Sequence, residues 1–249
     1  MMLKRVYLLF TFILVFAFMM QSVNFREEKL NYQIVYHWGL IWKHAASATL
    51  EIKDGDRFYE AKLSARTLSW VDNIYKVRDT LSSSIDKNRF VPVKYIKTTH
   101  EKKHDGKDIV EFFVKNGITT GHCTRIRPGK DDFKITLTTD GPAYDMLSVF
   151  YWLRNIDMGE LAKNKTISVT VFSGKRKERL DVTYVGEERV KMRDKSRRDA
   201  YHIKFKFTED GKNKSSDDID TWISTDESRI PLLLKGSLPI GEVRVYYRD

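Results

Sequence analysis

The segment from Ala46 to Arg66 reads ASATLEIKDGDRFYEAKLSAR and contains two runs in which apolar and polar residues alternate. Alternation with a period of two is typical of a β-strand that buries one face. The pair Asp54-Gly55 lies between the runs, and both residue types tolerate the positive φ angles of a tight hairpin turn. The segment therefore predicts two antiparallel strands joined by a short connection.

The same alternation recurs along the chain. It is found in residues 30–38, 93–99, 110–114, 167–171, 201–207 and 243–247. Further turn dipeptides separate these runs, namely Asp105-Gly106, Asn116-Gly117, Pro128-Gly129 and Ser173-Gly174. Short connections between neighbouring strands imply antiparallel pairing. We therefore expect a mainly β fold, a large curved antiparallel sheet or an open or closed barrel of about a dozen strands.

One segment has helical spacing instead. Between Ala143 and Asn155, apolar residues cover most of the circumference of a helix, at Met146, Leu147, Val149, Phe150, Trp152 and Leu153. A helix that is apolar nearly all round is buried. We expect it to fill the concave face of the sheet, with Gly159 near its end. A shorter helix or an irregular crossing is expected from Leu68 to Tyr75.

The start of the chain has the pattern of a secretory signal. Lys4 and Arg5 precede an uncharged, largely apolar run from Val6 to Met20. The run is shorter than the roughly 20 apolar residues that span a bilayer. We expect residues 1–23 to be a signal segment and residues 24–249 to form a single β-rich domain, periplasmic or secreted. An uncleaved inner-membrane anchor is the alternative.

Composition narrows the choice of partners. The chain is 41% hydrophobic, enough for a sizeable core, and its formal net charge is +10. A basic exported protein meets anionic lipid or acidic glycan before nucleic acid, so we expect no nucleic-acid partner. The one cysteine, Cys123, excludes an intrachain disulfide and is expected to be a structural thiol in a strand.

Residues His100 to His104 match the zinc-protease pattern of two histidines that bracket a glutamate, here Glu101. That chemistry requires a helix, which brings both imidazoles within reach of one zinc ion. Alternating residues lead into the motif and Asp105-Gly106 follows it, which predicts a hairpin. On one strand the two histidines would share a face and lie roughly 13 Å apart. We interpret the match as chance and expect no metal, with a zinc metalloprotease as the remote alternative.

Three groups of residues resemble one known family. They are Glu28–Tyr32 with the hairpin 36–50; the helix pattern Asp145, Leu147-Ser148, Tyr151 and Leu153-Arg154; and the closing pattern Trp222–Asp226, Arg229, Pro231 and Gly241. Together they resemble the bacterial domain-of-unknown-function family numbered 3108, over about residues 27–247. Ala46 departs from it, since the family usually has glycine there. The resemblance implies an exported envelope protein, similar in shape to lipoprotein carriers, and it supplies no reaction.

These observations lead to one expected function and two alternatives. We expect a non-enzymatic envelope protein, without a cofactor, that binds a hydrophobic or anionic ligand or a partner protein in the concave sheet. The candidate binding residues are Asp145, Tyr151, Arg154, Asp226 and Arg229. They could instead form the site of a hydrolase that acts on an envelope polymer. In a purely structural interpretation, Asp145 caps the helix, Asp226 and Arg229 set a turn, and the helix fills the cavity.

Overall fold

The computed structural model describes residues 25, 27–102, 104–211 and 215–249, so the expected signal segment lies outside the described residues. Within them, fifteen strands form one sheet. The first eight are β1 (Glu28–Trp38), β2 (Ile41–Asp54), β3 (Phe58–Thr67), β4 (Arg78–Asp86), β5 (Pro92–Glu101), β6 (His104–Lys115), β7 (Ile118–Ile126) and β8 (Phe133–Asp140). The others are β9 (Ala143–Tyr144), β10 (Thr166–Phe172), β11 (Lys177–Lys191), β12 (Arg197–Glu209), β13 (Ile219–Ser224), β14 (Pro231–Ser237) and β15 (Glu242–Arg248).

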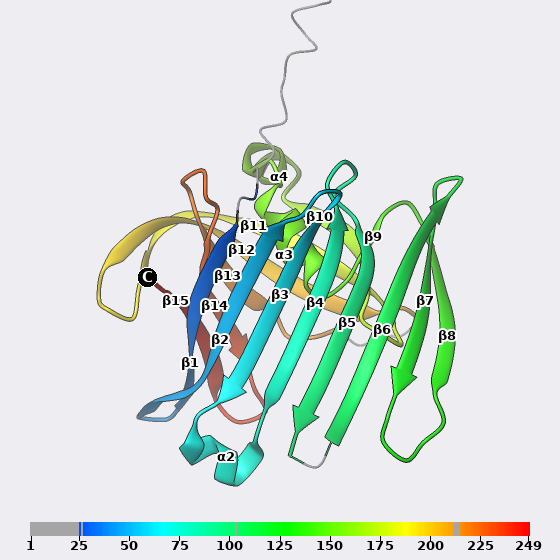
Figure 1. Ribbon diagram of the computed structural model, residues 1–249. Helices are drawn as coiled ribbons and strands as arrows, with labels where there is room; N and C mark the ends of the chain where they lie inside the picture. Colours follow the sequence, from blue (N-terminus) through cyan, green and yellow to red (C-terminus); the bar gives the residue numbers. More distant parts are fainter. Residues whose placement is uncertain (1–24, 26, 103, 212–214) are drawn as a thin grey trace, which may run out of the picture.

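The sheet is an antiparallel meander that curls into a nearly closed barrel (Figure 1). Strands β1 to β8 follow one another away from β1 on one side, and β15 back to β9 follow on the other. Strand β1 pairs with both β2 and β15 and so joins the two halves, with Tyr32 opposite Tyr247. The short pairing of β9 with β10 is parallel. The expected mainly β, antiparallel fold is confirmed.

Side chains close the barrel where the ladder ends, at β8 and β9. The hydroxyl oxygens of Thr139 on β8 and Thr170 on β10 lie 3.3 Å apart. Phe172 on β10 packs against Gly121 on β7, where an added Cβ would lie 2.6 Å from the Phe172 ring. A glycine in a strand often marks such a close approach. Gly121 therefore makes room for the ring that bridges the two edges.

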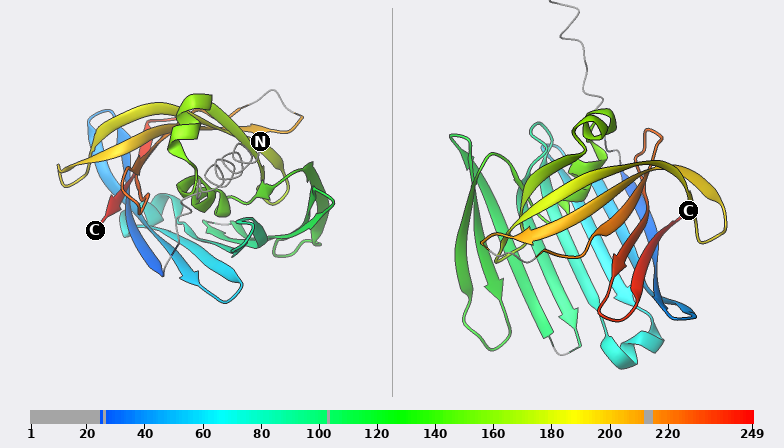
Figure 2. Two further views of the ribbon diagram at one scale, coloured as in Figure 1. Left: turned by 90° about the horizontal axis from the view of Figure 1, so that it is seen from above. Right: turned by 180° about the vertical axis from the view of Figure 1, so that it is seen from behind.

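Three helices accompany the sheet in the described residues: α2 (Ser69–Tyr75), α3 (Ser148–Arg154) and α4 (Met158–Asn164). Helix α3 lies inside the ring of strands, as the view down the barrel shows (Figure 2). The sequence-based helix from 143 to 155 was too long, because Ala143 and Tyr144 form β9. Gly159 does not end that helix; it lies in the first turn of α4, where its N–H donates to the carboxylate of Asp157. The short helix expected near residues 68–75 is confirmed as α2.

The expected turn at Asp105-Gly106 is wrong, although the other four dipeptides connect strands as predicted. The turn falls between Glu101 and His104, which pair with each other, and Gly106 lies within β6. Gly106 makes room for Arg127, because an added Cβ would lie 2.6 Å from the Nη1 of that arginine. The glycine at position 106 is therefore explained by its close contact with Arg127 and not by a turn.

The apolar core has two parts on either side of α3. Leu147 and Tyr151 pack with inward residues of the first half of the sheet, and Val149 and Leu153 pack with those of β10 to β13. A third cluster covers the outer face, where the end of the β11–β12 hairpin places Val190, Met192 and Ala200 against Val35, Leu233 and Tyr246. Buried Cys123 belongs to the first part, and burial raises the pKa of its thiol to about 11. Among the described residues, no helix is long and apolar enough to cross a bilayer.

The seam can be tested with Gly121→Val. We expect the substitution to lower the free energy of unfolding by about 1–3 kcal/mol, because the new side chain collides with Phe172. Urea denaturation measures the change. The control is His122→Val, which alters the exposed neighbour of Gly121 on the same strand. Equal effects of the two variants would contradict the packing described for the seam.

Candidate functional site

Asp145 ties the start of α3 to the wall of the barrel. One oxygen of its fully buried carboxylate accepts hydrogen bonds from the N–H groups of Leu147 (2.7 Å) and Ser148 (2.8 Å). The other accepts one from the hydroxyl of Ser83 on β4, at 2.6 Å. Burial raises the pKa of Asp145 above its ordinary value, although these hydrogen bonds act to lower it. The carboxylate satisfies amide groups at the helix start that have no partner within the helix.

Arg154 ties the other end of α3 to both halves of the sheet. Its guanidinium donates to both carboxylate oxygens of Glu28 on β1, at 2.7 and 2.8 Å. It also donates to the carbonyl oxygen of Ser228, in the turn between β13 and β14, at 2.7 Å. The Arg154 side chain is 1% exposed, and its guanidinium lies 4.8 Å from the centre of the Phe25 ring. Such a buried cation depends on its paired carboxylate.

Tyr151 faces the same end of the interior. Its hydroxyl donates to the carbonyl oxygen of Glu51 on β2 at 3.1 Å, and its ring packs edge-on against Phe25 at 5.2 Å. Burial raises the pKa of the phenol above its ordinary range. Tyr151 is thus a fixed part of the wall around α3.

Asp226 and Arg229 shape the β13–β14 turn. The Asp226 carboxylate accepts hydrogen bonds from the Ser228 N–H (2.9 Å) and the Ser224 hydroxyl (3.0 Å). Burial acts to raise the pKa of Asp226, but the hydrogen bonds from Ser228 and Ser224 outweigh it and lower the pKa. Arg229 has φ 49° and its guanidinium lies 4.7 Å from the centre of the Tyr201 ring. The structure therefore brings this turn to Arg154 through Ser228, whereas Asp145 lies at the opposite end of α3.

Sequence reasoning missed the partners of these residues. Glu28, Ser83 and Phe25 were not among the candidate residues, yet each contacts a residue of the helix pattern. A signal for Glu28 existed, because an arginine on a helix expected to be buried needs a carboxylate partner. No comparable pattern pointed to Ser83, which lies among three consecutive serines.

The zinc-protease pattern lies on the β5–β6 hairpin, as predicted. His100 pairs with Asp105 and Glu101 pairs with His104, so the two histidines lie on opposite faces of the sheet. The expectation that they share a face was wrong, because the turn falls inside the motif. Glu101 accepts a hydrogen bond from the Tyr75 hydroxyl at 2.7 Å, and His100 contacts Asp105 at 2.9 Å. Within the described ranges, no three His, Cys, Asp or Glu side chains are grouped to hold a metal ion.

The interior is filled beside α3 and hollow toward α2. On three strands, the inward residue beside α3 is buried; these residues are Leu30, Ala61 and Ile85, at 4%, 2% and 0% exposure. Further along the same strands toward α2, the inward residues are only partly buried; these residues are Ile34, Ala65 and Leu81. The two helices α3 and α4 lie at one end of the barrel and α2 at the other (Figure 1). The burial of the inward side chains therefore decreases along the barrel axis from α3 toward α2.

A cleft of about 300 Å³ opens in the hollow part. Its wall is apolar and is formed by Ile219, Leu234, Val243 and Val245 with Gly236, and its rim is formed by residues 216–218 and Ser237. Thr221 faces the same side as Leu234, its ladder partner, and its hydroxyl is buried without a hydrogen-bond partner among the described residues. Across the interior, Asp108 pairs with Arg125 at 3.0 Å and with Arg127 at 2.8 Å. The hollow thus combines an apolar wall with a charged one.

Residues 31–248 match the model of a family described as a protein of unknown function, DUF3108. The chain belongs to this family. The resemblance seen in the three sequence motifs is thereby confirmed. No curated protein matches the chain.

Among solved structures, the chain is similar to the crystal structure of a β-barrel-like protein of domain of unknown function DUF1849 from Brucella abortus. The two share 11% sequence identity with a TM-score of 0.61, over 90% of this chain and 96% of that chain. At this identity the similarity shows a shared fold and nothing about activity.

The role of the buried pair can be tested with Glu28→Gln. We expect this change to lower the free energy of unfolding by about 3–5 kcal/mol, because it leaves the Arg154 guanidinium buried without a counter-charge. The double variant Glu28→Gln/Arg154→Met should recover part of the loss, since it removes the uncompensated charge. The control is Glu160→Gln, which breaks the exposed pair with Lys163 and should change the stability little, because solvent screens that pair. A double variant less stable than Glu28→Gln alone would contradict this account.

The raised pKa of Asp145 predicts a pH dependence. The folded protein holds this proton more tightly than the unfolded chain, so the favourable contribution is complete below the unfolded pKa, near 3.8. It is lost as the pH rises through the higher folded pKa. Asp145→Asn cannot ionise and keeps an oxygen for the Leu147 and Ser148 N–H groups.

The stability of Asp145→Asn relative to the wild type should therefore improve as the pH rises from about 4 to 8. Urea denaturation at a series of pH values measures this difference. Asp145→Ala serves as the comparison, because it removes the acceptor as well and should be less stable than Asp145→Asn throughout. A difference that stays constant, or that moves against Asp145→Asn, would refute the expectation.

Proposed function

We propose that the protein is a non-enzymatic cell-envelope protein that binds the apolar part of an amphiphilic ligand in the hollow half of its barrel. The main support is that the burial of inward apolar side chains decreases along the barrel axis, from Leu30 to Ile34 and from Ile85 to Leu81. A barrel that served only as a scaffold would bury its inward apolar side chains along its whole length. Here α3 fills one end, and the inward apolar residues toward the other end are only partly buried.

The lining indicates the chemistry of the ligand. The cleft of about 300 Å³ is at the lower end of the usual size of small-molecule sites, and its wall of Ile219, Leu234, Val243 and Val245 suits a hydrocarbon chain. The unpartnered hydroxyl of Thr221 lies on the same side and could bond a polar group or a water molecule. The guanidinium groups of Arg125 and Arg127 lie across the interior and share the one carboxylate of Asp108, so the group keeps one positive charge that suits a negatively charged head group. An amphiphile with an anionic head satisfies both walls.

The family motifs support binding rather than hydrolysis. Asp145 and Arg154 have their charged groups engaged by the helix start and by Glu28, and Asp226 is engaged by its own turn. Asp145 and Arg154 hold the two ends of α3 and so define where the hollow begins. Export is proposed from the basic and apolar start of the chain, and it would bring the protein to the lipids and glycans of the envelope.

The cleft can be tested with Gly236→Phe. An added Cβ at this position would meet Val243 at an ordinary 3.8 Å, so the ring can occupy the cleft without backbone strain. We expect purified wild-type protein to enhance the fluorescence of the apolar dye N-phenyl-1-naphthylamine, and Gly236→Phe to bind it about tenfold more weakly. Native mass spectrometry after gentle extraction would report a co-purifying amphiphile in the same preparations.

The control for this experiment is Lys62→Phe, which adds the same ring on the exposed face of β3. It should bind the dye as the wild type does, and thermal unfolding would verify that both variants are folded. If the wild type binds no dye and carries no amphiphile, or if folded Gly236→Phe binds dye as tightly as Lys62→Phe, the proposal is wrong.

A further inference from the structure

Three apolar projections lie together at the α2 end of the barrel. They are the β1–β2 turn with Leu40 (100% exposed), the β14–β15 turn with Ile240 (63%) and helix α2 with Ile74 (67%). The hydroxyl of Tyr36 near the end of β1 donates to the carbonyl oxygen of Ile240 at 2.9 Å and so joins β1 to the β14–β15 turn. Figure 1 and the right-hand view of Figure 2 place the turns and α2 at the same end.

Folding does not require leucine in the β1–β2 turn. Trp38 and Ile41 pair across a two-residue connection, in which Gly39 takes the positive φ of 56°. Leu40, the second residue of that connection, is fully exposed and packs against nothing. Tight turns favour small or polar residues such as Asn, Asp and Gly. A single exposed leucine is unremarkable, but adjacent projections that each carry a large aliphatic residue form a patch of the kind that marks an interaction site.

Aromatic residues surround these projections. Trp38, Trp42 and Tyr75 are 54%, 40% and 41% exposed. The Trp42 ring stacks on His37 at 3.6 Å and lies under the guanidinium of Arg244, at 4.3 Å. Tryptophan and tyrosine are enriched where proteins meet the boundary between lipid and water, because their rings are apolar and their N–H or O–H groups can stay hydrated.

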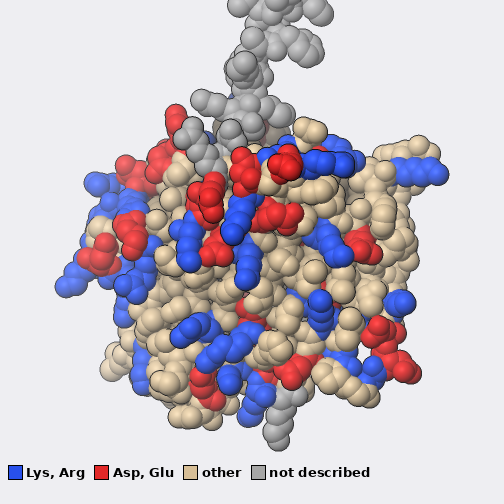
Figure 3. Space-filling view, viewed as in Figure 1, with Lys and Arg blue, Asp and Glu red and all other residues tan. Residues whose placement is uncertain are grey.

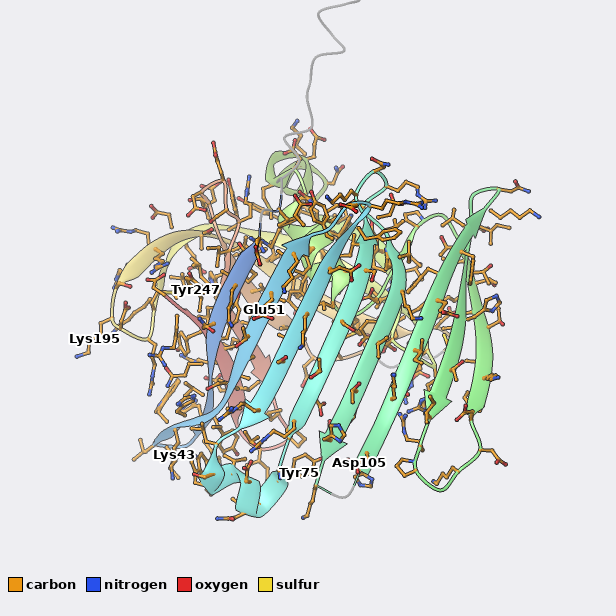
Figure 4. All side chains as sticks on the ribbon, in the orientation of Figure 1. Lys43, Glu51, Tyr75, Asp105, Lys195 and Tyr247 are labelled. Carbon is orange, nitrogen blue, oxygen red and sulfur yellow. The ribbon has the colours of Figure 1, made fainter. Side chains whose placement is uncertain are left out.

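The charges around the patch favour an anionic partner. Lys43, Lys76 and Lys102 are exposed at this end, and the side-chain view places Lys43 beside α2 and Tyr75 (Figure 4). Several carboxylates lie nearby. Asp72 pairs with Arg78 at 2.6 Å and Glu242 contacts Arg244. On the β5–β6 hairpin at the same end, Glu101 accepts a hydrogen bond from the Tyr75 hydroxyl and Asp105 contacts His100 at 2.9 Å. On the face seen in Figure 3, basic and acidic side chains are interspersed, at the α2 end as elsewhere.

We propose that this end of the barrel docks on the surface of an anionic lipid bilayer, with Leu40 and Ile240 inserted among the lipids and the lysines against the head groups. Apolar insertion and electrostatic attraction act together in such peripheral binding. The docking does not depend on ligand binding in the cleft. It has a geometric consequence for that cleft, since the hollow half of the barrel lies at the docking end and faces the bilayer.

The test is flotation of the purified protein with vesicles. Vesicles of phosphatidylglycerol and phosphatidylcholine should carry the wild-type protein, vesicles of phosphatidylcholine alone should carry much less, and added salt should weaken the binding. Leu40→Glu and Ile240→Glu should each weaken binding to the anionic vesicles about tenfold or more, because each removes an inserted side chain. Both positions are exposed, so both variants should remain folded.

Two matched controls place the same charge elsewhere. Val185→Glu alters an aliphatic residue of 50% exposure on β11, and Phe113→Glu alters an aromatic one of 54% exposure at the far end of β6. Both should bind anionic vesicles as the wild type does. Failure of the wild type to float, equal flotation of Leu40→Glu, or an equal loss in the controls would overturn the proposal. So would sedimentation showing a dimer that Leu40→Glu dissociates, because the patch would then bind a second copy of the chain.

Discussion

The ion pair between Arg154 and Glu28 is the contact on which the rest of the arrangement depends. Glu28 is the first residue of β1, the strand that joins the two halves of the sheet. Arg154 is the last residue of α3, and it also holds the β13–β14 turn through the carbonyl oxygen of Ser228. A guanidinium is suited to this position because its planar donors serve a carboxylate and a carbonyl oxygen at once. One side chain thereby connects the interior helix, the joining strand and the returning half of the barrel.

The placement of α3 explains why the barrel is filled unequally. The helix is only seven residues long, and it is held at its start by Asp145 and Ser83 and at its end by Glu28. It can therefore cover only part of the inner face, from Leu30 and Ile85 across to Val171 and Ile203. Beyond its reach the inward side chains are only partly buried, and a cleft remains. The hollow is a consequence of a short helix in a long-stranded barrel.

The two ends of the barrel consequently differ in character. At the α3 end, Phe25 packs with Tyr59, Phe90 and Tyr151 and covers the interior. At the α2 end, large apolar side chains project outward from turns instead of packing inward. Phe25 and Leu40 are both apolar, but Phe25 is buried at one end of the barrel and Leu40 is exposed at the other. The proposed ligand site and the proposed docking surface therefore both lie at the α2 end.

The sequence by itself determined the β class, the antiparallel pairing, the family and the positions of two of the three described helices, α2 and α3, but not that of α4. These follow from local rules, because strand alternation, turn dipeptides and helical spacing are written in neighbouring residues. The tertiary structure alone decided the start of α3, since Asp145 needs Ser83 from 62 residues away. It also decided the role of Gly106, which makes room for Arg127 rather than turning the chain, and the faces of His100 and His104. Contacts between distant segments depend on how the sheet closes, and no local pattern records which side chains that closure brings together.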